Sequence, residues 1–311
     1  MSGRPAATVV FGEALVDDFG SEQAVGGAPF NVARHLAAFL EPQLVITRIG
    51  DDGNGATVRA EFERFAMLAA GLQVDSMEET GRVLVERGPQ GHRFSILPGQ
   101  AWDYIDTDAA LGCLVEVEPS MLYFGTLAQR GTVSRAALTA LFAAVAAPRF
   151  LDLNLRADEY DLDCVTRSLQ AANILKVNEE ELQVLFGWYC RIDPSEQLAA
   201  EQVHTACRSL LQMFSLDGMV VTMGHRGSAW FDADGRTLVN RDNPAPPFVI
   251  DTVGAGDAFA AILLLGHARG WALETTLARA NEFAGAICAI SGAVPRDLGF
   301  YDKWVAKWRS A

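Results

Sequence analysis

Short apolar runs alternate along the chain with longer segments that repeat apolar residues at helical spacing. Each short run closes near Gly, Asn or Asp, as buried parallel strands often do. The expected strands are 8–11, 44–49, 121–124, 150–153, 174–177 and 219–223. The expected helices are 29–40, 56–70, 134–146, 162–172, 179–186, 196–214, 255–269, 273–291 and 301–308. This alternation predicts a doubly wound α/β domain with a mainly parallel sheet.

One part of the chain departs from this alternation. Residues 81–87 and 92–97 alternate apolar and polar positions on either side of the turn sequence Gly-Pro-Gln-Gly, which is typical of a β-hairpin. Together with residues 15–25 they predict a small β-piece attached to the main body. The pattern leaves open whether this piece is a lid over a site or a surface hairpin without a role.

The composition is that of a single globular domain with a large core. Of the 311 residues, 50% are hydrophobic and 21% are charged. The formal net charge of -14 argues against nucleic acid as a partner. The five cysteines are odd in number and widely spaced, which predicts reduced thiols and a cytoplasmic location. No apolar stretch is long enough to span a bilayer and the start shows no signal peptide, so we expect no membrane partner.

Residues 251–259, Asp-Thr-Val-Gly-Ala-Gly-Asp-Ala-Phe, carry the strongest chemical signal. They join the apolar run 248–250, which we interpret as a strand, to the expected helix 255–269. Glycine lets the backbone approach a ligand closely, and the first amides of a helix have no partner within it. With the helix dipole, the amides of Gly254, Ala255 and Gly256 would form a pocket for an anion such as phosphate.

Asp257 falls in the first turn of that expected helix. A carboxylate at this position is stabilised in its ionised form, so it could accept a proton from an attacking hydroxyl beside the phosphate pocket. The simpler alternative is an aspartate that only satisfies free amides of the helix. The glycines directly before Asp257 favour the catalytic interpretation.

Two other phosphate-binding motifs fail. The lysines are Lys176, Lys303 and Lys307, and none follows the glycine-rich loop of a P-loop kinase, which excludes that class. Residues 53–58 and 254–259 lack the third small residue of a dinucleotide fingerprint. An NAD-dependent oxidoreductase is therefore the weaker alternative.

Residues 251–259 resemble the C-terminal signature of the ribokinase (phosphofructokinase-B) family of sugar kinases. Residues 26–33, Gly-Gly-Ala-Pro-Phe-Asn-Val-Ala, resemble the family's N-terminal signature, most of all in fructokinase-like members, and weaker matches lie between. The resemblance implies one kinase domain over 1–311, with the fold of a ribokinase-like three-layer sandwich. It implies a mainly parallel sheet flanked by helices and a small β-sheet lid near 12–27 and 81–100. It also implies transfer of the γ-phosphate of ATP to a sugar hydroxyl, with Asp257 as the base.

The same resemblance assigns the sugar side of the site. Asp17 and Asn31 would hydrogen-bond sugar hydroxyls, for which carboxylate and amide groups are suited. Gly26 and Gly27 would form a hinge by which the lid closes.

Arg156 ends the segment Asp-Leu-Asn-Leu-Arg at 152–156, which resembles fructokinase-like and ketodeoxygluconate-kinase-like members. It could steady a phosphate or an acidic sugar, or it could pair with Asp158 or Asp161 at the surface. The segment favours fructose or a related ketose as substrate, with a 2-keto-3-deoxy sugar acid as the nearest alternative. A non-catalytic sugar or nucleotide sensor is a further alternative of another class.

The resemblance also implies a nucleotide and metal side. Asn178 and Glu181 would organise Mg²⁺ through water, although their spacing also fits a helix-capping pair. The nucleotide-side residues would be Thr222, Gly224, Gly227 and Asn281.

Two further features are implied for the family. Many relatives bind a monovalent cation, for which the matching positions here are Asp251, Val253 and Ser291, with K⁺ as the candidate ion. Relatives often pair through their lids, and an exposed β-piece would allow a homodimer through the lid, although the sequence leaves the oligomeric state open.

Overall fold

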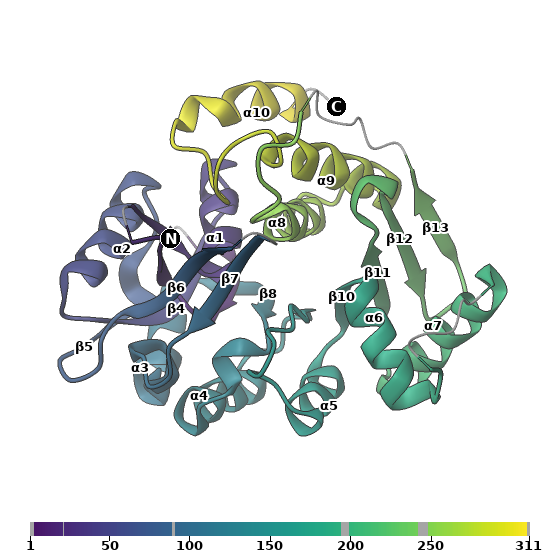
Figure 1. The fold of residues 1–311 in the computed structure, drawn as a ribbon, viewed down its shortest axis with the longest axis horizontal. Coiled ribbons are helices and arrows are strands. Elements are labelled where there is room, and N and C mark those ends of the chain that lie inside the picture. The colour runs from purple at the N-terminus through teal and green to yellow at the C-terminus, as the bar shows by residue number, and fades with distance from the viewer. Residues whose placement is uncertain (1–2, 21, 89–90, 194–198, 242–247, 310–311) are drawn as a thin grey trace.

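The computed structural model describes residues 3–20, 22–88, 91–193, 199–241 and 248–309. It contains one large sheet with helices on both faces and a separate small sheet (Figure 1). The strands of the large sheet are β1 (Ala6–Phe11), β4 (Gln43–Gly50), β5 (Leu72–Asp75), β8 (Glu118–Phe124), β9 (Arg149–Asp152), β10 (Ile174–Asn178), β11 (Gly218–Thr222), β12 (Ser228–Asp232) and β13 (Thr237–Asn240). Those of the small sheet are β2 (Leu15–Asp18), β3 (Gln23–Gly26), β6 (Gly81–Gly88) and β7 (Gly91–Ile96). The helices are α1 (Ala28–Ala38), α2 (Gly53–Arg64), α3 (Thr107–Gly112), α4 (Thr132–Ala144), α5 (Leu162–Ala171), α6 (Glu179–Leu185), α7 (Ala200–Phe214), α8 (Ala255–Ala268), α9 (Leu273–Ile287) and α10 (Asp302–Arg309).

The large sheet has the strand order β13-β12-β11-β10-β9-β8-β1-β4-β5. The pairs from β11 through to β5 are parallel, and β12 and β13 add an antiparallel edge. After β1 the chain first builds outward through β4 and β5 and then returns to the other side of β1 with β8. The strand order thus reverses between β1 and β8, and open α/β sheets bind ligands at the carboxyl ends of the strands beside such a point.

Two apolar cores lie on opposite faces of the large sheet. Successive residues of β1 alternate between them: Val9 and Phe11 belong to one core and Val10 to the other. One core includes residues of α4 to α7 and the other includes residues of α1, α2, α8, α9 and α10. The helices accordingly form one layer above and one below the sheet in Figure 1. The three-layer sandwich predicted from the sequence is confirmed.

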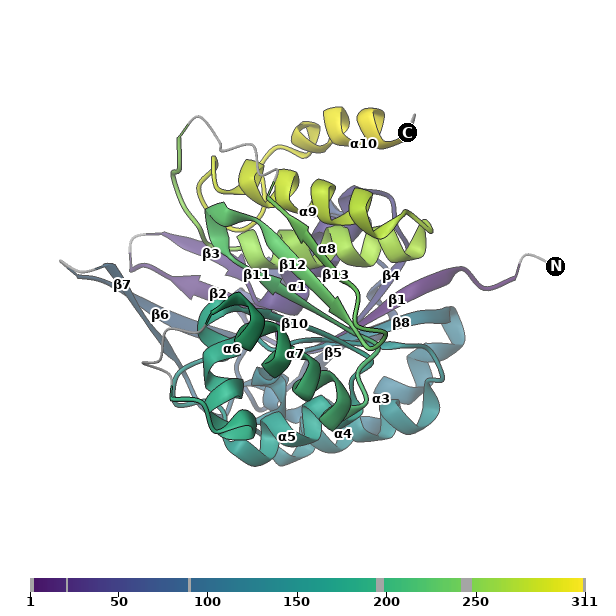
Figure 2. The ribbon, with the colours of Figure 1, turned by 90° about the vertical axis from the view of Figure 1, so that its right-hand side faces the viewer.

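The small sheet projects beyond the edge where the parallel strands end (Figure 2). Its order is β3-β2-β6-β7, so it combines the two segments that the sequence assigned to a β-piece. β2 pairs with β3 antiparallel and with β6 parallel, and β6 and β7 form the expected hairpin. Residues 89 and 90 of the turn predicted between them lie outside the described residues.

The structure corrects one predicted strand. Residues 248–250 form no strand, and Phe248, Val249 and Ile250 are more than half exposed. Ile250 donates its amide to the carbonyl of Cys288 at 2.8 Å. Although its residues are apolar, the segment runs over the surface near the end of α9 instead of entering the sheet.

In the part of the chain that the structure describes, no helix has both the length and the apolar character needed to cross a bilayer.

Candidate active site

Helix α8 begins at a backbone turn that suits glycine alone. Gly254 caps the helix with φ 76°, in the left-handed region, and a Cβ there would lie 2.3 Å from the Cβ of Ala293. Gly256 is exposed, whereas Asp257 is only 9% exposed. The start of α8 therefore opens to the surface while the Asp257 carboxylate lies buried beside it.

The first amides of α8 have no acceptors within the helix. The amide of Ala255 makes a long contact of 3.3 Å with the carbonyl of Thr252, and the amide of Ala258 makes the first α-helical bond, 2.8 Å to the carbonyl of Gly254. The helix dipole adds positive potential at this end. The start of α8 thus has the chemistry of an anion site, as the sequence predicts.

Asn31 connects α1 to the start of α8. Its Nδ2 donates to Oδ2 of Asp257 at 2.7 Å, and its Oδ1 accepts from Nη2 of Arg34 at 2.5 Å. Arg34 is held in turn by Glu61 at 2.7 Å. Because Arg34 can only donate, it fixes the orientation of the Asn31 amide with its nitrogen toward Asp257.

The environment of Asp257 favours its neutral form more than water does. Burial raises the pKa of Asp257 above its ordinary value, and the charge of Asp152 adds to this effect. The hydrogen bond from Asn31 and the positive charges of Lys176 and Arg156 lower the pKa and so oppose the shift. A raised pKa brings the carboxylate closer to the range in which a general base works efficiently.

Asp17 lies on β2 in the small sheet and is partly buried. A Cβ on Gly26 would lie 2.5 Å from Oδ2 of Asp17, so the glycine leaves space for this carboxylate. Burial raises the pKa of Asp17 to about 6, against the positive charges of Arg156 and Arg34. The charge of Asp257 raises the same pKa, which shows that the two carboxylates share one electrostatic environment.

Glu13 was not among the residues predicted from the sequence, yet it lies at the same place. It follows β1, is 5% exposed, and its Oε1 accepts from the amide of Ala28 at 3.3 Å. Gly27 has φ 100°, and a Cβ there would lie 2.5 Å from the carbonyl oxygen of Glu13. Burial raises the pKa of Glu13 to about 7, although Arg156 and the Ala28 amide lower it. The end of β1 and the start of α1 are therefore packed directly against each other.

Arg156 is exposed in the loop after β9. Among the described residues it forms no ion pair with Asp158 or Asp161, and Asp161 instead caps α5 through the amide of Cys164. The charge of Arg156 lowers the pKa values of Glu13, Asp17 and Asp257. This favours the site interpretation of Arg156 over the surface ion pair.

Asn178 and Glu181 form the capping box that their spacing allows. Oδ1 of Asn178 accepts from the Glu181 amide, and Oε2 of Glu181 accepts from the Asn178 amide, both at 2.8 Å. Oε1 of Glu181 accepts from the amide of Leu155 at 2.9 Å, which links α6 to the loop after β9. Both oxygens of the buried Glu181 carboxylate therefore already hold backbone amides.

The four nucleotide-side residues divide between β11 and α9. Thr222 ends β11, and Gly224 and Gly227 follow with φ 56° and 91°. A Cβ on Gly227 would lie 2.1 Å from the carbonyl oxygen of Asn240, and Asn281 donates to the side chain of Asn240 at 2.9 Å. Gly227 and Asn281 therefore meet at the end of β13.

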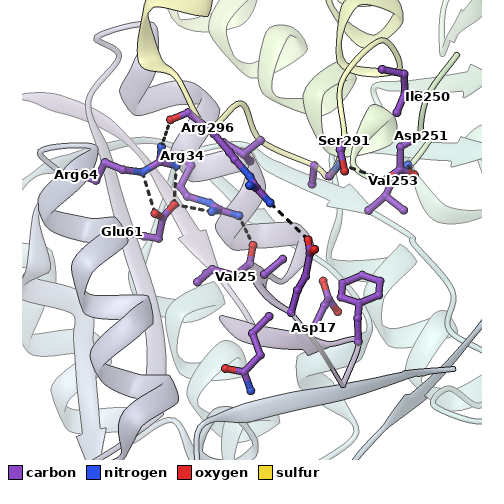
Figure 3. Close-up of a pocket in the computed structure, with 17 residues that line it drawn as sticks. Asp17, Val25, Arg34, Glu61, Arg64, Ile250, Asp251, Val253, Ser291 and Arg296 are labelled. Atoms are coloured by element: carbon purple, nitrogen blue, oxygen red, sulfur yellow. Dashed lines mark hydrogen bonds and ion pairs between the residues drawn. The ribbon is translucent and has the colours of Figure 1, made fainter. Parts of the chain in front are cut away.

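A cavity of about 850 Å³ opens between the small sheet, α1, α2 and the loops at 250–253 and 291–296 (Figure 3). Of the predicted residues, Asp17, Asp251, Val253 and Ser291 line it, and Asp257 lies outside its lining. Asp251 accepts from the amides of Val253 at 3.0 Å and Gly292 at 3.1 Å, which ties the two loops together.

A buried lysine is the main feature that the sequence analysis missed. Nζ of Lys176 on β10 lies 2.8 and 2.9 Å from the two carboxylate oxygens of Asp152 on β9. A Cβ on Gly256 would lie 3.5 Å from the same nitrogen. A lysine inside an apolar strand is rarely buried without a partner, and that pattern is the sequence signal that could have revealed it.

Comparison with known proteins identifies the class to which this site belongs. The model of the family described as "pfkB family carbohydrate kinase" matches residues 9–297. The chain belongs to the pfkB family of carbohydrate kinases. It is accordingly a sugar phosphotransferase, as the two signature segments predict.

The chain is similar in sequence or in fold to several named sugar kinases. The chain is 30% identical over 271 residues to a fructokinase of Escherichia coli, with 83% of each covered. Its fold matches a Vibrio cholerae fructokinase crystallised with fructose, ADP and calcium ion, at 24% identity, TM-score 0.74, and 93% and 94% coverage. It also matches a 2-dehydro-3-deoxygluconokinase of Thermotoga maritima at 16% identity, TM-score 0.79, and 97% and 99% coverage.

Proposed function

We propose that this pfkB-family kinase transfers the γ-phosphate of ATP to a hydroxyl of fructose or a related ketose, with Asp257 as the base. The observation that carries the proposal is the buried Asp257 carboxylate, oriented by Asn31 at the start of α8. In this proposal the substrate hydroxyl gives its proton to Asp257 as its oxygen attacks the γ-phosphorus, and ADP leaves as the bond from the γ-phosphorus to the β,γ-bridging oxygen breaks. The amides of Gly254, Ala255 and Gly256 stabilise the charge on the transferring group.

The sugar lies between the small sheet and the carboxyl ends of the strands. Asp17 and Asn31 hydrogen-bond its hydroxyls, and Arg156 adds positive charge on this side. The small sheet acts as a lid that excludes water, with Gly26 and Gly27 as its hinge. The left-handed conformation of Gly27 against the carbonyl of Glu13 supports a hinge at this point.

ATP lies toward Thr222, Gly224, Gly227 and Asn281. Mg²⁺, when bound, would neutralise phosphate charge during transfer. The oxygen donors of Asn178 and Glu181 suit this ion. Because the two carboxylate oxygens of Glu181 already accept from the amides of Asn178 and Leu155, Glu181 would hold Mg²⁺ through water.

K⁺ is the proposed ion for the loops at Asp251, Val253 and Ser291. The carboxylate of Asp251 bridges the two loops, so a cation beside it would stabilise the turn that leads into α8. We expect higher turnover with K⁺ than with tetramethylammonium at equal ionic strength. Equal rates with both ions would contradict this assignment.

A 2-keto-3-deoxy sugar acid is the second candidate substrate. The exposed Arg156 supports it, since a guanidinium can pair with a substrate carboxylate. The carboxylates of Glu13, Asp17 and Asp257, whose pKa values the charge of Arg156 lowers, favour a neutral sugar. Family membership favours phosphoryl transfer over both the sensor and the oxidoreductase alternatives.

ADP release measured over a set of acceptors tests the proposed function. The set comprises fructose, ketodeoxygluconate, ribose, tagatose phosphate and adenosine. We expect the highest kcat/KM with fructose or another neutral ketose. A clear preference for ketodeoxygluconate would move the assignment to the second candidate, and no ADP release with any sugar would contradict a catalytic role.

Location and assembly complete the proposal. The five cysteines are free thiols, which supports a reducing compartment and hence the cytoplasm. The edge strands β3 and β7 of the small sheet support a homodimer through this sheet, which sedimentation would test.

A further inference from the structure

Lys176 places a positive charge inside the protein next to the start of α8. It lies in the middle of β10, and its side chain is 8% exposed. A Cβ on Gly256 would lie 3.5 Å from its Nζ, so the ammonium group lies against the first turn of α8. A cation at a helix N-terminus is unfavourable, because that end of the helix dipole is itself positive. Only nearby negative charge makes this arrangement stable.

Asp152 supplies that negative charge and fixes the position of the ammonium group. Lys176 and Asp152 are register partners on β10 and β9, and Nζ contacts both carboxylate oxygens. The hydroxyl of Tyr123 donates to Oδ2 of Asp152 at 3.1 Å, which holds the carboxylate from a third strand. Burial, the largest single effect, would lower the pKa of Lys176, but the charge and hydrogen bond of Asp152 together with the charges of Glu181 and Asp257 outweigh it, and the net shift is upward. The lysine therefore stays charged at neutral pH.

We propose that the Lys176–Asp152 ion pair is a positioning unit for phosphoryl transfer, in which Lys176 keeps Asp257 ionised as a base and Asp152 holds Lys176 in place. The inference rests on the proposed role of Asp257. It adds two residues that the proposed sugar, nucleotide and metal contacts do not include.

The two charges act on Asp257 in opposite directions. Positive charge favours the carboxylate, so Lys176 lowers the pKa of Asp257, whereas Asp152 raises it. The other groups around Asp257 come from five further elements. They are Asn31 on α1, Glu13 after β1, Asp17 on β2, Tyr123 on β8 and Arg156 after β9. Lys176 differs from the exposed Arg156 in being a buried cation whose Nζ lies against Gly256 in the first turn of α8.

The pH profile of kcat/KM is the readout that a purely structural role would not move. As the pH falls, the rate drops when Asp257 becomes protonated, which gives an acid limb. We expect Lys176→Met to move this limb toward higher pH by about one unit, because Asp257 loses the charge that favours its ionised form. The control is Lys307→Met, which removes an exposed lysine paired with Glu282 on α9 and should leave the limb in place.

A second pair of variants keeps the test valid if Lys176→Met alone fails to fold. Removing one partner of a buried ion pair is strongly destabilising, so thermal unfolding must confirm that each variant folds. The same comparison is made between Asp152→Asn and the double variant Asp152→Asn/Lys176→Met. Here too we expect the variant without Lys176 to have its acid limb at higher pH.

An acid limb that does not move on loss of Lys176 in either background, in folded protein, overturns the inference and leaves Asp257 as the base. A wild-type profile without any acid limb would instead contradict the proposed function itself. The two failures are therefore distinguishable in one series of measurements.

Discussion

Asn31 donates a hydrogen bond to Asp257 at 2.7 Å, although 226 positions separate the two residues in the chain. The contact joins the two segments that carry the family resemblance, one at the start of α1 and one at the start of α8. Arg34 donates to Oδ1 of Asn31 and is itself held by an ion pair with Glu61, so the Asn31 amide has a fixed orientation. The proposed base is therefore oriented by a chain of side chains that begins on α2.

Replacing Asn31 by alanine tests this orientation. The variant loses the hydrogen bond that favours ionised Asp257 and also a proposed sugar contact. We expect kcat/KM for the sugar to fall about 10- to 100-fold and its acid limb to move to higher pH. The pH dependence of ADP release measures both effects. An unchanged profile in Asn31→Ala would show that the contact does not act on the reaction, and Asn54→Ala on α2 serves as the control.

Gly27 and Gly20 provide a matched pair that tests the close packing at Gly27. Both have positive φ, 100° and 81°, but a Cβ on Gly27 would lie 2.5 Å from the Glu13 carbonyl oxygen, whereas Gly20 has open space around it. We expect Gly20→Ala to lower the free energy of unfolding by about 1 kcal/mol and Gly27→Ala by at least about twice that. Chemical denaturation measures both, and equal losses would contradict the role of close packing at Gly27.

Glu13 predicts an unusual pH dependence of stability. Its pKa is about 7 in the folded protein against an ordinary 4.5, so the folded state binds this proton more tightly. The contribution of Glu13 to the free energy of unfolding should therefore fall as the pH rises through the window from 4.5 to about 7. We expect the Glu13→Gln variant, which cannot ionise, to have a free energy of unfolding about 2–3 kcal/mol higher at pH 8.

Denaturation at pH 4 and pH 8 checks this expectation. The two proteins should be closest in stability at pH 4, where Glu13 is mostly protonated in either state. The exposed Glu118→Gln is the control and should show no such gain. A Glu13→Gln variant that is less stable at pH 8 would show that ionised Glu13 is a net stabilising group.

The strands and helices of the main body could be predicted because burial on both faces leaves a strong pattern. The edge elements could not. The sequence analysis missed β12 and β13, which form the antiparallel edge of the sheet. It also missed the short helix α3, which begins where Asp106 accepts from the amide of Ala109. Residues 248–250 were wrongly predicted as a strand, because an apolar run does not reveal whether a neighbouring strand is present to pair with it.

The residues of the candidate site also fall into two groups, those carried by a contiguous motif and those brought together only by the fold. The glycines and Asp257 were predicted from a contiguous motif, and Asn31 from a second one. The Lys176–Asp152 pair was missed because it depends on the register between β9 and β10, two strands joined through a helix. Glu13 was missed for a related reason, since its contact with Gly27 exists only once the small sheet has formed.

Turnover of Asp257→Asn tests the central claim most directly. Asparagine keeps the size of the side chain but cannot accept the proton, so the variant should fold and bind ATP like the wild type. With saturating ATP and fructose, or the best acceptor from the screen, we predict that kcat for ADP release falls on the order of 10²-fold or more. A folded Asp257→Asn variant with near-normal kcat would contradict Asp257 as the base.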